Sequence, residues 1–236
     1  MRMADILFSQ GFGTRRACAG LIEHGAVAVA GRTVADPGEE VATDGLNFTV
    51  HGQAWAFHAR LLVMLHKPAG YECSRAPHHH PSVLSLLPEP LRNRGAQPVG
   101  RLDQDTTGLL LLTDHGPWLH RLTHPRRHVN KTYRVTTSRD IEPAQVASLL
   151  AGVVLKDDPK PARAQACQQQ GPRELLLTIS EGRYHQVKRM LAAVGNHVQA
   201  LHRSAIGALT LPPDLAPGAW RLLTAQVAQD LTASSR

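Results

Sequence analysis

Cysteine is scarce in this sequence, and long hydrophobic runs are absent. The three cysteines, Cys18, Cys73 and Cys167, are an odd number with no Cys-x-x-Cys spacing, which excludes a disulfide framework and a cysteine-rich zinc site. Hydrophobic runs such as residues 61–65 and 109–112 are much shorter than the roughly 18 residues of a membrane span. The first residues also lack the hydrophobic segment of a signal peptide. We therefore expect a protein of the reducing cytoplasm that does not enter a membrane.

Several well-known site motifs are missing as well. The segment Gly11-Phe12-Gly13 has no third glycine and follows no strand, which argues against a dinucleotide fingerprint, and no P-loop pattern occurs. His120 and His124 have the spacing of a zinc-protease helix, but no Glu lies between them. No Gly-x-Ser-x-Gly elbow indicates a hydrolase. The adjacent histidines 78–80 cannot share one face, so we expect no metal site.

Positive charge is present in excess and is unevenly distributed. The chain has 21 Arg and 5 Lys against 19 acidic residues, for a formal net charge of +7. Residues 1–60 carry five basic and six acidic residues, whereas residues 115–139 and 182–213 contain no acidic residue at all. A basic chain with such stretches is typical of a nucleic-acid partner, although a solvated basic face would look similar.

A small N-terminal domain, residues 1–58, is predicted to combine two helices with short strands. Thr14 is a suitable N-cap for the second helix and Gly25 a suitable stop. The linker to the next domain is expected near 51–59. The predicted elements are helices at 3–10 and 15–24, two short strands around an Ala-Gly turn within 26–34, and a strand at 46–50.

The remaining residues, 60–236, are predicted to form a larger second domain. Strands dominate and helices are inserted irregularly, so the fold class is α+β rather than a regular βαβ succession. The predicted strands are 61–66, 97–102, 109–113, 131–137, 174–180, 200–211 and 220–223, and the predicted helices are 114–124, 143–150 and 184–194.

The most informative segment, residues 100–113, reads Gly-Arg-Leu-Asp-Gln-Asp-Thr-Thr-Gly-Leu-Leu-Leu-Leu-Thr. It places a carboxylate-bearing loop before a hydrophobic run that anchors it to a core, and loops on rigid strands often carry catalytic residues. Spacing alone favours an ordinary turn capped by Asp and Thr. Asp103 is one candidate acid; we expect Asp105 to be a loop-capping residue and Asp114 a helix N-cap.

Two further segments combine polar, basic and aromatic residues. Residues 181–190 read Glu-Gly-Arg-Tyr-His-Gln-Val-Lys-Arg-Met and open a predicted helix, whose N-terminus favours an anion. Residues 131–135, Lys-Thr-Tyr-Arg-Val, place an aromatic ring in a basic strand. That tyrosine is equally consistent with an ordinary half-buried strand position.

These segments together resemble the bacterial ribosomal small-subunit pseudouridine synthases, the RsuA type. The resemblance covers nearly the whole chain, with residues 1–58 similar to an S4-like RNA-binding domain and the rest to the catalytic domain. The motif at 100–113 is the family signature. Sister enzymes of large-subunit RNA tend to read Asn-Arg-Gln-Ile-Arg-Arg where residues 184–189 here read Tyr-His-Gln-Val-Lys-Arg.

The resemblance implies a mixed, largely antiparallel sheet and an isomerase that converts uridine to pseudouridine in 16S rRNA. The N1–C1′ bond breaks, the uracil turns, and C5 bonds to C1′, so no cofactor is needed. By motif position Asp103 is the catalytic aspartate and Lys188 the cation that keeps it ionised when it is desolvated. Tyr133 packs against the uracil, and Arg101 enters the RNA stack when the uridine leaves it.

The expected partner is small-subunit rRNA, either alone or in an assembly intermediate with ribosomal proteins, and the protein is expected to be a monomer. Because residues 1–60 have a slight acidic excess, we expect them to play a modest role in RNA affinity. The residues expected to contact RNA, besides Arg101, are Arg15, Arg16, Arg126, Arg127, Lys131, Arg183, His185, Gln186 and Arg189.

Two other functions stay open at this point. The same reaction at a 23S rRNA site is the nearest alternative. A non-catalytic RNA-binding factor for ribosome assembly is a second. Replacing Asp103 with Asn separates an enzyme, which would lose turnover and still bind RNA, from a pure binder.

Overall fold

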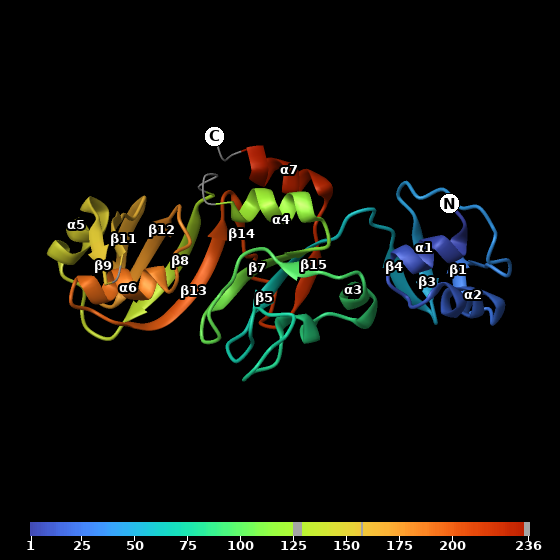
Figure 1. Ribbon diagram of the computed structural model, residues 1–236, viewed down its shortest axis with the longest axis horizontal. Coiled ribbons are helices and arrows are strands. Elements are labelled where there is room, and N and C mark those ends of the chain that lie inside the picture. The colour runs from blue at the N-terminus through green and yellow to red at the C-terminus, as the bar shows by residue number, and fades with distance from the viewer. Residues whose placement is uncertain (125–128, 157, 234–236) are drawn as a thin grey trace. The chain divides into compact units, whose positions relative to one another are not determined.

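The computed structural model describes residues 1–124, 129–156 and 158–233. The chain divides into two compact units (Figure 1), an N-terminal unit of residues 1–61 with 87–96 and a C-terminal unit of residues 62–86 with 97–236. The sequence-based prediction placed residues 1–58 in the first domain and residues 60–236, with the segment 87–96, in the second. Within the described residues no helix combines the length and hydrophobicity required to cross a bilayer.

The N-terminal unit consists of three helices and a four-stranded antiparallel sheet of order β2-β1-β3-β4. Thr14 caps the second helix as predicted, since its Oγ1 accepts a hydrogen bond from the amide of Ala17 at 3.2 Å. The elements are α1 (Met3–Ser9), α2 (Arg15–Glu23), β1 (Val27–Val29), β2 (Arg32–Thr33), β3 (Asn47–Val50), β4 (Gln53–Ala56) and α3 (Glu89–Asn93).

The linker predicted near 51–59 is wrong in its first half. Residues 53–56 form β4, which pairs with β3 through a two-residue turn at His51 and Gly52. Both turn residues have positive φ, +48° and +77°, the conformation required by the hairpin turn that matches strand twist. The Ala30-Gly31 turn between β1 and β2 uses the same geometry. A His-Gly pair is a weaker hairpin signal than Asn-Gly, which is why the strand was missed.

A hydrophobic core holds the helices of the N-terminal unit onto its sheet. One face of α1 and α2 packs against alternate residues of β1 and β3, because side chains of a strand point to opposite faces in turn. The buried members are Met3, Ile6, Leu7, Cys18, Ile22, Val27, Val34, Leu46, Phe48 and Val50.

The C-terminal unit is built on a nine-stranded sheet of order β11-β12-β8-β13-β7-β5-β15, with β14 beside β13 and β6 beside β7. The β13–β7 pair is parallel and the other pairs are antiparallel. This is the mixed, largely antiparallel sheet that the family resemblance implied. Its strands are β5 (Leu62–Lys67), β6 (Gln97–Pro98), β7 (Thr107–Thr113), β8 (Lys131–Thr137), β11 (Ala166–Gly171), β12 (Glu174–Ile179), β13 (Val198–Ile206), β14 (Leu209–Thr210) and β15 (Trp220–Leu222).

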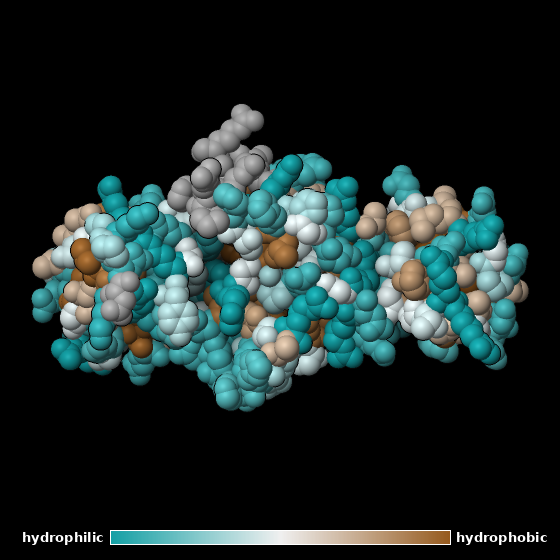
Figure 2. All heavy atoms as spheres, viewed as in Figure 1, coloured by the Kyte–Doolittle hydropathy of each residue, from teal (hydrophilic) through white to brown (hydrophobic). Residues whose placement is uncertain are grey.

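Helices cover this sheet in two groups. The helices α4 (Gly116–Thr123) and α7 (Ala225–Ala233) pack together beside β7 and β5, where Trp118, Ala228 and Leu62 form a buried cluster (Figure 1). The helices α5 (Pro143–Ala151) and α6 (Gln186–Ala193) pack near β11 and β13. A 3₁₀ turn η1 (Val83–Leu86) and the ribbon of β9 (Val153–Leu155) and β10 (Asp158–Ala162) complete the unit. Figure 2 shows hydrophobic side chains on the viewed face as small patches among hydrophilic ones.

The leucine run of β7 anchors the site-bearing loop. Leu109, Leu110, Leu111 and Leu112 are all fully buried, so both faces of the strand are covered. A strand buried on both sides loses the alternation of an exposed strand and becomes a continuous hydrophobic run. The loop that precedes it is therefore held by one of the most buried parts of the chain.

Candidate active site

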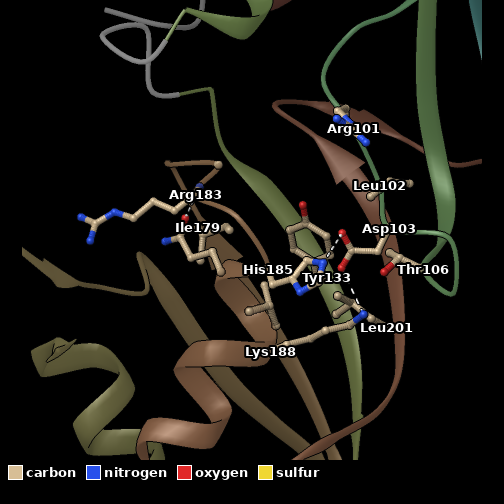
Figure 3. Close-up of a pocket in the computed structure, with 13 residues that line it drawn as sticks. Arg101, Leu102, Asp103, Thr106, Tyr133, Ile179, Arg183, His185, Lys188 and Leu201 are labelled. Carbon is tan, nitrogen blue, oxygen red and sulfur yellow. Dashed lines mark hydrogen bonds and ion pairs between the residues drawn. The ribbon is translucent and has the colours of Figure 1, made fainter. Parts of the chain in front are cut away.

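One pocket gathers residues from four segments that are far apart in the sequence (Figure 3). Asp103 lies in the loop between β6 and β7, Tyr133 on β8, Lys188 on α6 and Leu201 on β13. The complete lining is Arg101, Leu102, Asp103, Thr106, Tyr133, Ile179, Gly182, Arg183, His185, Gln186, Val187, Lys188 and Leu201.

The ammonium of Lys67 fixes the loop that carries Asp103. Lys67 is fully buried at the end of β5, and its Nζ donates to the carbonyl oxygens of Pro68, Gln104 and Thr106 at 3.0, 3.1 and 2.8 Å. Burial lowers the pKa of Lys67. A lysine that ends a hydrophobic strand was the signal available in the sequence for this contact.

A glycine allows the neighbouring strands to meet at the base of the loop. Gly108 has φ +107°, and a Cβ built there would lie 2.3 Å from the carbonyl oxygen of Arg203 on β13. Arg203 is 3% exposed and its Nε donates to the carbonyl of Leu109 at 2.7 Å. Its Nη2 and the hydroxyl of Thr106 are buried with no hydrogen-bond partner among the described residues.

Asp103 lies between two basic side chains of the segment that opens α6. Its Oδ2 is 3.1 Å from Nζ of Lys188, and its Oδ1 is 3.3 Å from Nε2 of His185 (Figure 3). Its side chain is 30% exposed, so the carboxylate stays accessible from the pocket. The structure thus brings together the aspartate and the lysine that the sequence motifs paired.

Asp105 shares the same lysine, which was not expected. Nζ of Lys188 is 2.7 and 2.9 Å from the two carboxylate oxygens of Asp105. Burial raises the pKa of Asp105, but the hydrogen bond and charge of Lys188 outweigh it and leave the pKa lowered. Burial lowers the pKa of Lys188, but its two carboxylate partners outweigh it and raise the pKa. Asp105 is therefore more than a loop-capping residue.

The third candidate acid, Asp114, does not line this pocket. We expected it to be the N-cap of the following helix, but α4 begins at Gly116 and its N-cap is His115. The N-cap therefore falls one residue after Asp114, and the helix begins two residues after it.

The two other residues assigned to the reaction lie on the pocket wall. Tyr133 is 8% exposed, held in the middle of the sheet by β12 and β13 on either side. Arg101 is exposed at the start of the loop, above Asp103 in Figure 3.

Several residues expected to contact RNA have partners within the protein. The guanidinium of Arg183 binds Asp158, Glu181 and two carbonyl groups of β10, so it is anchored in place. Gln186 is 4% exposed and accepts a hydrogen bond from the amide of Arg183, which limits its access to RNA. These contacts of Arg183 and Gln186 fix the backbone on either side of His185.

Four further candidates among the described residues do not line the pocket. Arg189 donates to the carbonyl groups of Tyr184 and Lys156. Lys131 donates to the carbonyl of Ser180 at 3.4 Å, and burial lowers its pKa to about 8.

Two candidates belong to the N-terminal unit. Arg15 pairs with Asp5 and lies over the ring of Phe8, and Arg16 is exposed. Arg126 and Arg127 lie outside the described residues.

The adjacent histidines 78–80 are explained by their backbone. Their three amides donate to the carboxylate of Glu72 at 2.9 to 3.1 Å, and these hydrogen bonds lower the pKa of Glu72. The segment is a carboxylate-anchored loop.

Comparison with known proteins identifies the family of the chain. Residues 61–193 match the family model described as RNA pseudouridylate synthase, and residues 1–45 match the S4 domain. The chain belongs to the RNA pseudouridylate synthase family and carries an S4 domain at its N-terminus. Enzymes of this family are isomerases.

Within the family the chain is similar to proteins of one branch. It is 45% identical to ribosomal small subunit pseudouridine synthase A of Escherichia coli over 230 residues, 93% of this chain and 95% of that protein. The protein of the same name from Salmonella typhimurium is 51% identical over 170 residues, 71% of this chain and 72% of that protein. A crystal structure of a pseudouridylate synthase covers 98% of this chain and 99% of its own, at 34% identity and a TM-score of 0.70.

Proposed function

We propose that this protein isomerises uridine to pseudouridine in the small-subunit ribosomal RNA. The observation that carries the proposal is the Asp103 carboxylate, held in a pocket 3.1 Å from the ammonium of Lys188. The similarity to small-subunit synthases over most of the chain supports the choice of RNA. The 23S rRNA alternative has no comparable support.

In the proposed reaction, Asp103 acts on an extruded uridine either as a nucleophile or as a base at the sugar. The N1–C1′ bond breaks, the uracil turns within the pocket, and C5 bonds to C1′. The proton on C5 leaves and N1 ends with a proton, so the atoms of the nucleoside are conserved. The ammonium of Lys188, 3.1 Å from the carboxylate, offers a balancing charge where the carboxylate meets the neutral base.

The other pocket residues have roles set by their positions. Tyr133, buried in the pocket wall, packs against the uracil and is placed to assist removal of the C5 proton. Extrusion of a base costs a few kcal/mol, and the planar guanidinium of Arg101 can stack in the gap left behind.

The decisive experiment compares Asp103→Asn with a matched control. We expect the wild type to release tritium from small-subunit rRNA labelled at C5 of uridine, and Asp103→Asn to release none while it still binds RNA in a filter assay. Asp140→Asn, an exposed aspartate outside the pocket, should keep full turnover. Turnover by Asp103→Asn at the wild-type rate would contradict the proposal.

Mapping pseudouridines in a deletion strain tests the target. Loss of one site from small-subunit rRNA supports the proposal; loss from large-subunit rRNA points to the alternative, and no loss points to an assembly factor.

We further propose that the protein acts as a monomer in the cytoplasm. Assays on naked RNA and on assembly particles distinguish the two substrate forms, and sedimentation measures the oligomeric state.

A further inference from the structure

The ring of Tyr184 lies flat against the imidazole of His185 at the edge of the pocket. The two ring centroids are 3.8 Å apart and their planes differ by 17°. Tyr184 is 76% exposed, which makes it an exposed large aromatic residue beside a pocket that it does not itself line. One face of the tyrosine ring is therefore covered by histidine, and most of the remainder is open to solvent.

The pair is joined directly to the proposed reaction centre. His185 lines the pocket, and its Nε2 is 3.3 Å from Oδ1 of Asp103. A base that stacked on the outer face of Tyr184 would thus be separated from the Asp103 carboxylate by two stacked rings. Such a position suits a nucleotide next to the extruded uridine, because the uridine itself occupies the pocket.

The backbone that presents the pair is held in an unusual conformation. His185 has φ +47° and ψ +34°, the left-handed region that few residues other than glycine adopt. Neighbouring contacts hold this conformation: Arg189 donates to the carbonyl of Tyr184, and Arg183 is anchored by two carboxylates. Strain of this kind persists only where surrounding structure imposes it, and it is concentrated at functional sites.

A basic side chain lies beside the pair. Arg183 and Lys188 are ion-paired with carboxylates. Arg189 instead donates to the carbonyl groups of Tyr184 and Lys156, which brings its positive charge next to the tyrosine. Exposed aromatic rings beside basic side chains are the usual means of binding single-stranded nucleic acid, since every base offers a flat face. A single exposed tyrosine alone would mean little, because hydrophobic surface residues are common. Stacking, enforced backbone geometry and contact with Asp103 distinguish this one.

We propose that Tyr184 and His185 form a stacking platform for the RNA base adjacent to the target uridine. The inference rests on the proposed function and adds a binding subsite to it. The platform keeps the neighbouring nucleotide stacked after the uridine has left, so it contributes to RNA affinity and to the choice of strand position more than to the chemical step.

Variants of Tyr184 test the flat ring separately from its hydroxyl. On small-subunit rRNA labelled at C5 of uridine, Tyr184→Phe should keep KM within about twofold, because stacking requires only the ring. Tyr184→Ala and Tyr184→Leu should raise KM by about 5- to 100-fold with little change in kcat. Thermal unfolding should match the wild type, since the residue is exposed.

Abasic RNA locates the contact. In short RNAs built around the mapped uridine, removing one flanking base should raise the wild-type KM by a similar factor and leave that of Tyr184→Ala unchanged. The inference is overturned if Tyr184→Leu keeps the wild-type KM, or if Tyr184→Ala remains fully sensitive to each abasic position. Failure of the proposed function looks different, because the wild type would then release no tritium.

Discussion

The ammonium of Lys188 lies closer to Asp105 than to Asp103, at 2.7 Å against 3.1 Å. One cation thus holds two carboxylates of the same loop, and only one of them lines the pocket. The second carboxylate keeps Lys188 extended toward the loop, which places its charge beside Asp103. This sharing has a measurable consequence for stability.

Replacing Asp105 with Asn should weaken the fold only slightly and in a pH-dependent way. The pKa of Asp105 is lowered in the folded state, so its contribution is present above the unfolded value of about 3.9 and is lost as pH falls through the folded pKa. Because Asp105 is 63% exposed, the pair contributes about 0.2–1 kcal/mol at neutral pH. Urea unfolding at pH 7, 5 and 3 should show the gap to wild type narrowing at the lowest pH; a gap as large at pH 3 as at pH 7 would disprove the assignment.

Replacing Lys67 with Met should destabilise the protein and slow turnover. Three carbonyl oxygens of the loop would lose their buried donor, at a cost on the order of 3 kcal/mol. Turnover should fall with stability because the same loop carries Asp103. Lys160→Met, at an exposed position, is the matched control and should leave both unchanged. A Lys67→Met variant with wild-type unfolding and turnover would show that the loop is fixed by other contacts.

Replacing Gly108 with Ala should disrupt the junction of β7 and β13. The new Cβ would lie 2.3 Å from a backbone oxygen of Arg203 at a φ of +107°, so the two strands must separate. We expect a loss of about 3 kcal/mol or more in unfolding free energy. Gly116→Ala, where a Cβ meets nothing within 4 Å, should change it by less than about 0.5 kcal/mol. Equal melting temperatures for the two variants would contradict this.

The free energy of unfolding should rise between pH 8 and pH 10 because of the buried Lys131. Burial, aided by the charge of Arg203, lowers its folded pKa to about 8, whereas the unfolded value is about 10.4. Between these values the unfolded chain binds the proton that the folded chain has lost, so the free energy of unfolding increases with pH. Lys131→Met should be more stable than wild type at pH 7, with the difference shrinking toward pH 10. Unfolding curves that stay parallel across this range would refute the lowered pKa.

Local signals in the sequence predicted much of the fold. Thr14 marked the start of α2, and the β-branched run at Lys131–Thr137 marked β8 with the bounds that the structure has. These elements were predictable because the residues that define them are neighbours in the chain. The strand β11 was missed because its Gln-rich residues are mostly exposed at the sheet edge and show no hydrophobic alternation. Its pairing with β12 is made by backbone groups, which every sequence possesses.

The residues of the site also separate into those that the sequence predicted and those that only the tertiary structure revealed. The amino-acid sequence by itself determined the two-domain order, the α+β class and which segments carry Asp103, Tyr133 and Lys188, because each is encoded in a short motif. The tertiary structure alone decided that Lys188 is shared with Asp105, that Lys67 fixes the loop from below, and that Tyr184 presents an open ring. Each of those facts depends on distances across the sheet or on a backbone angle, which arise only when distant segments pack together.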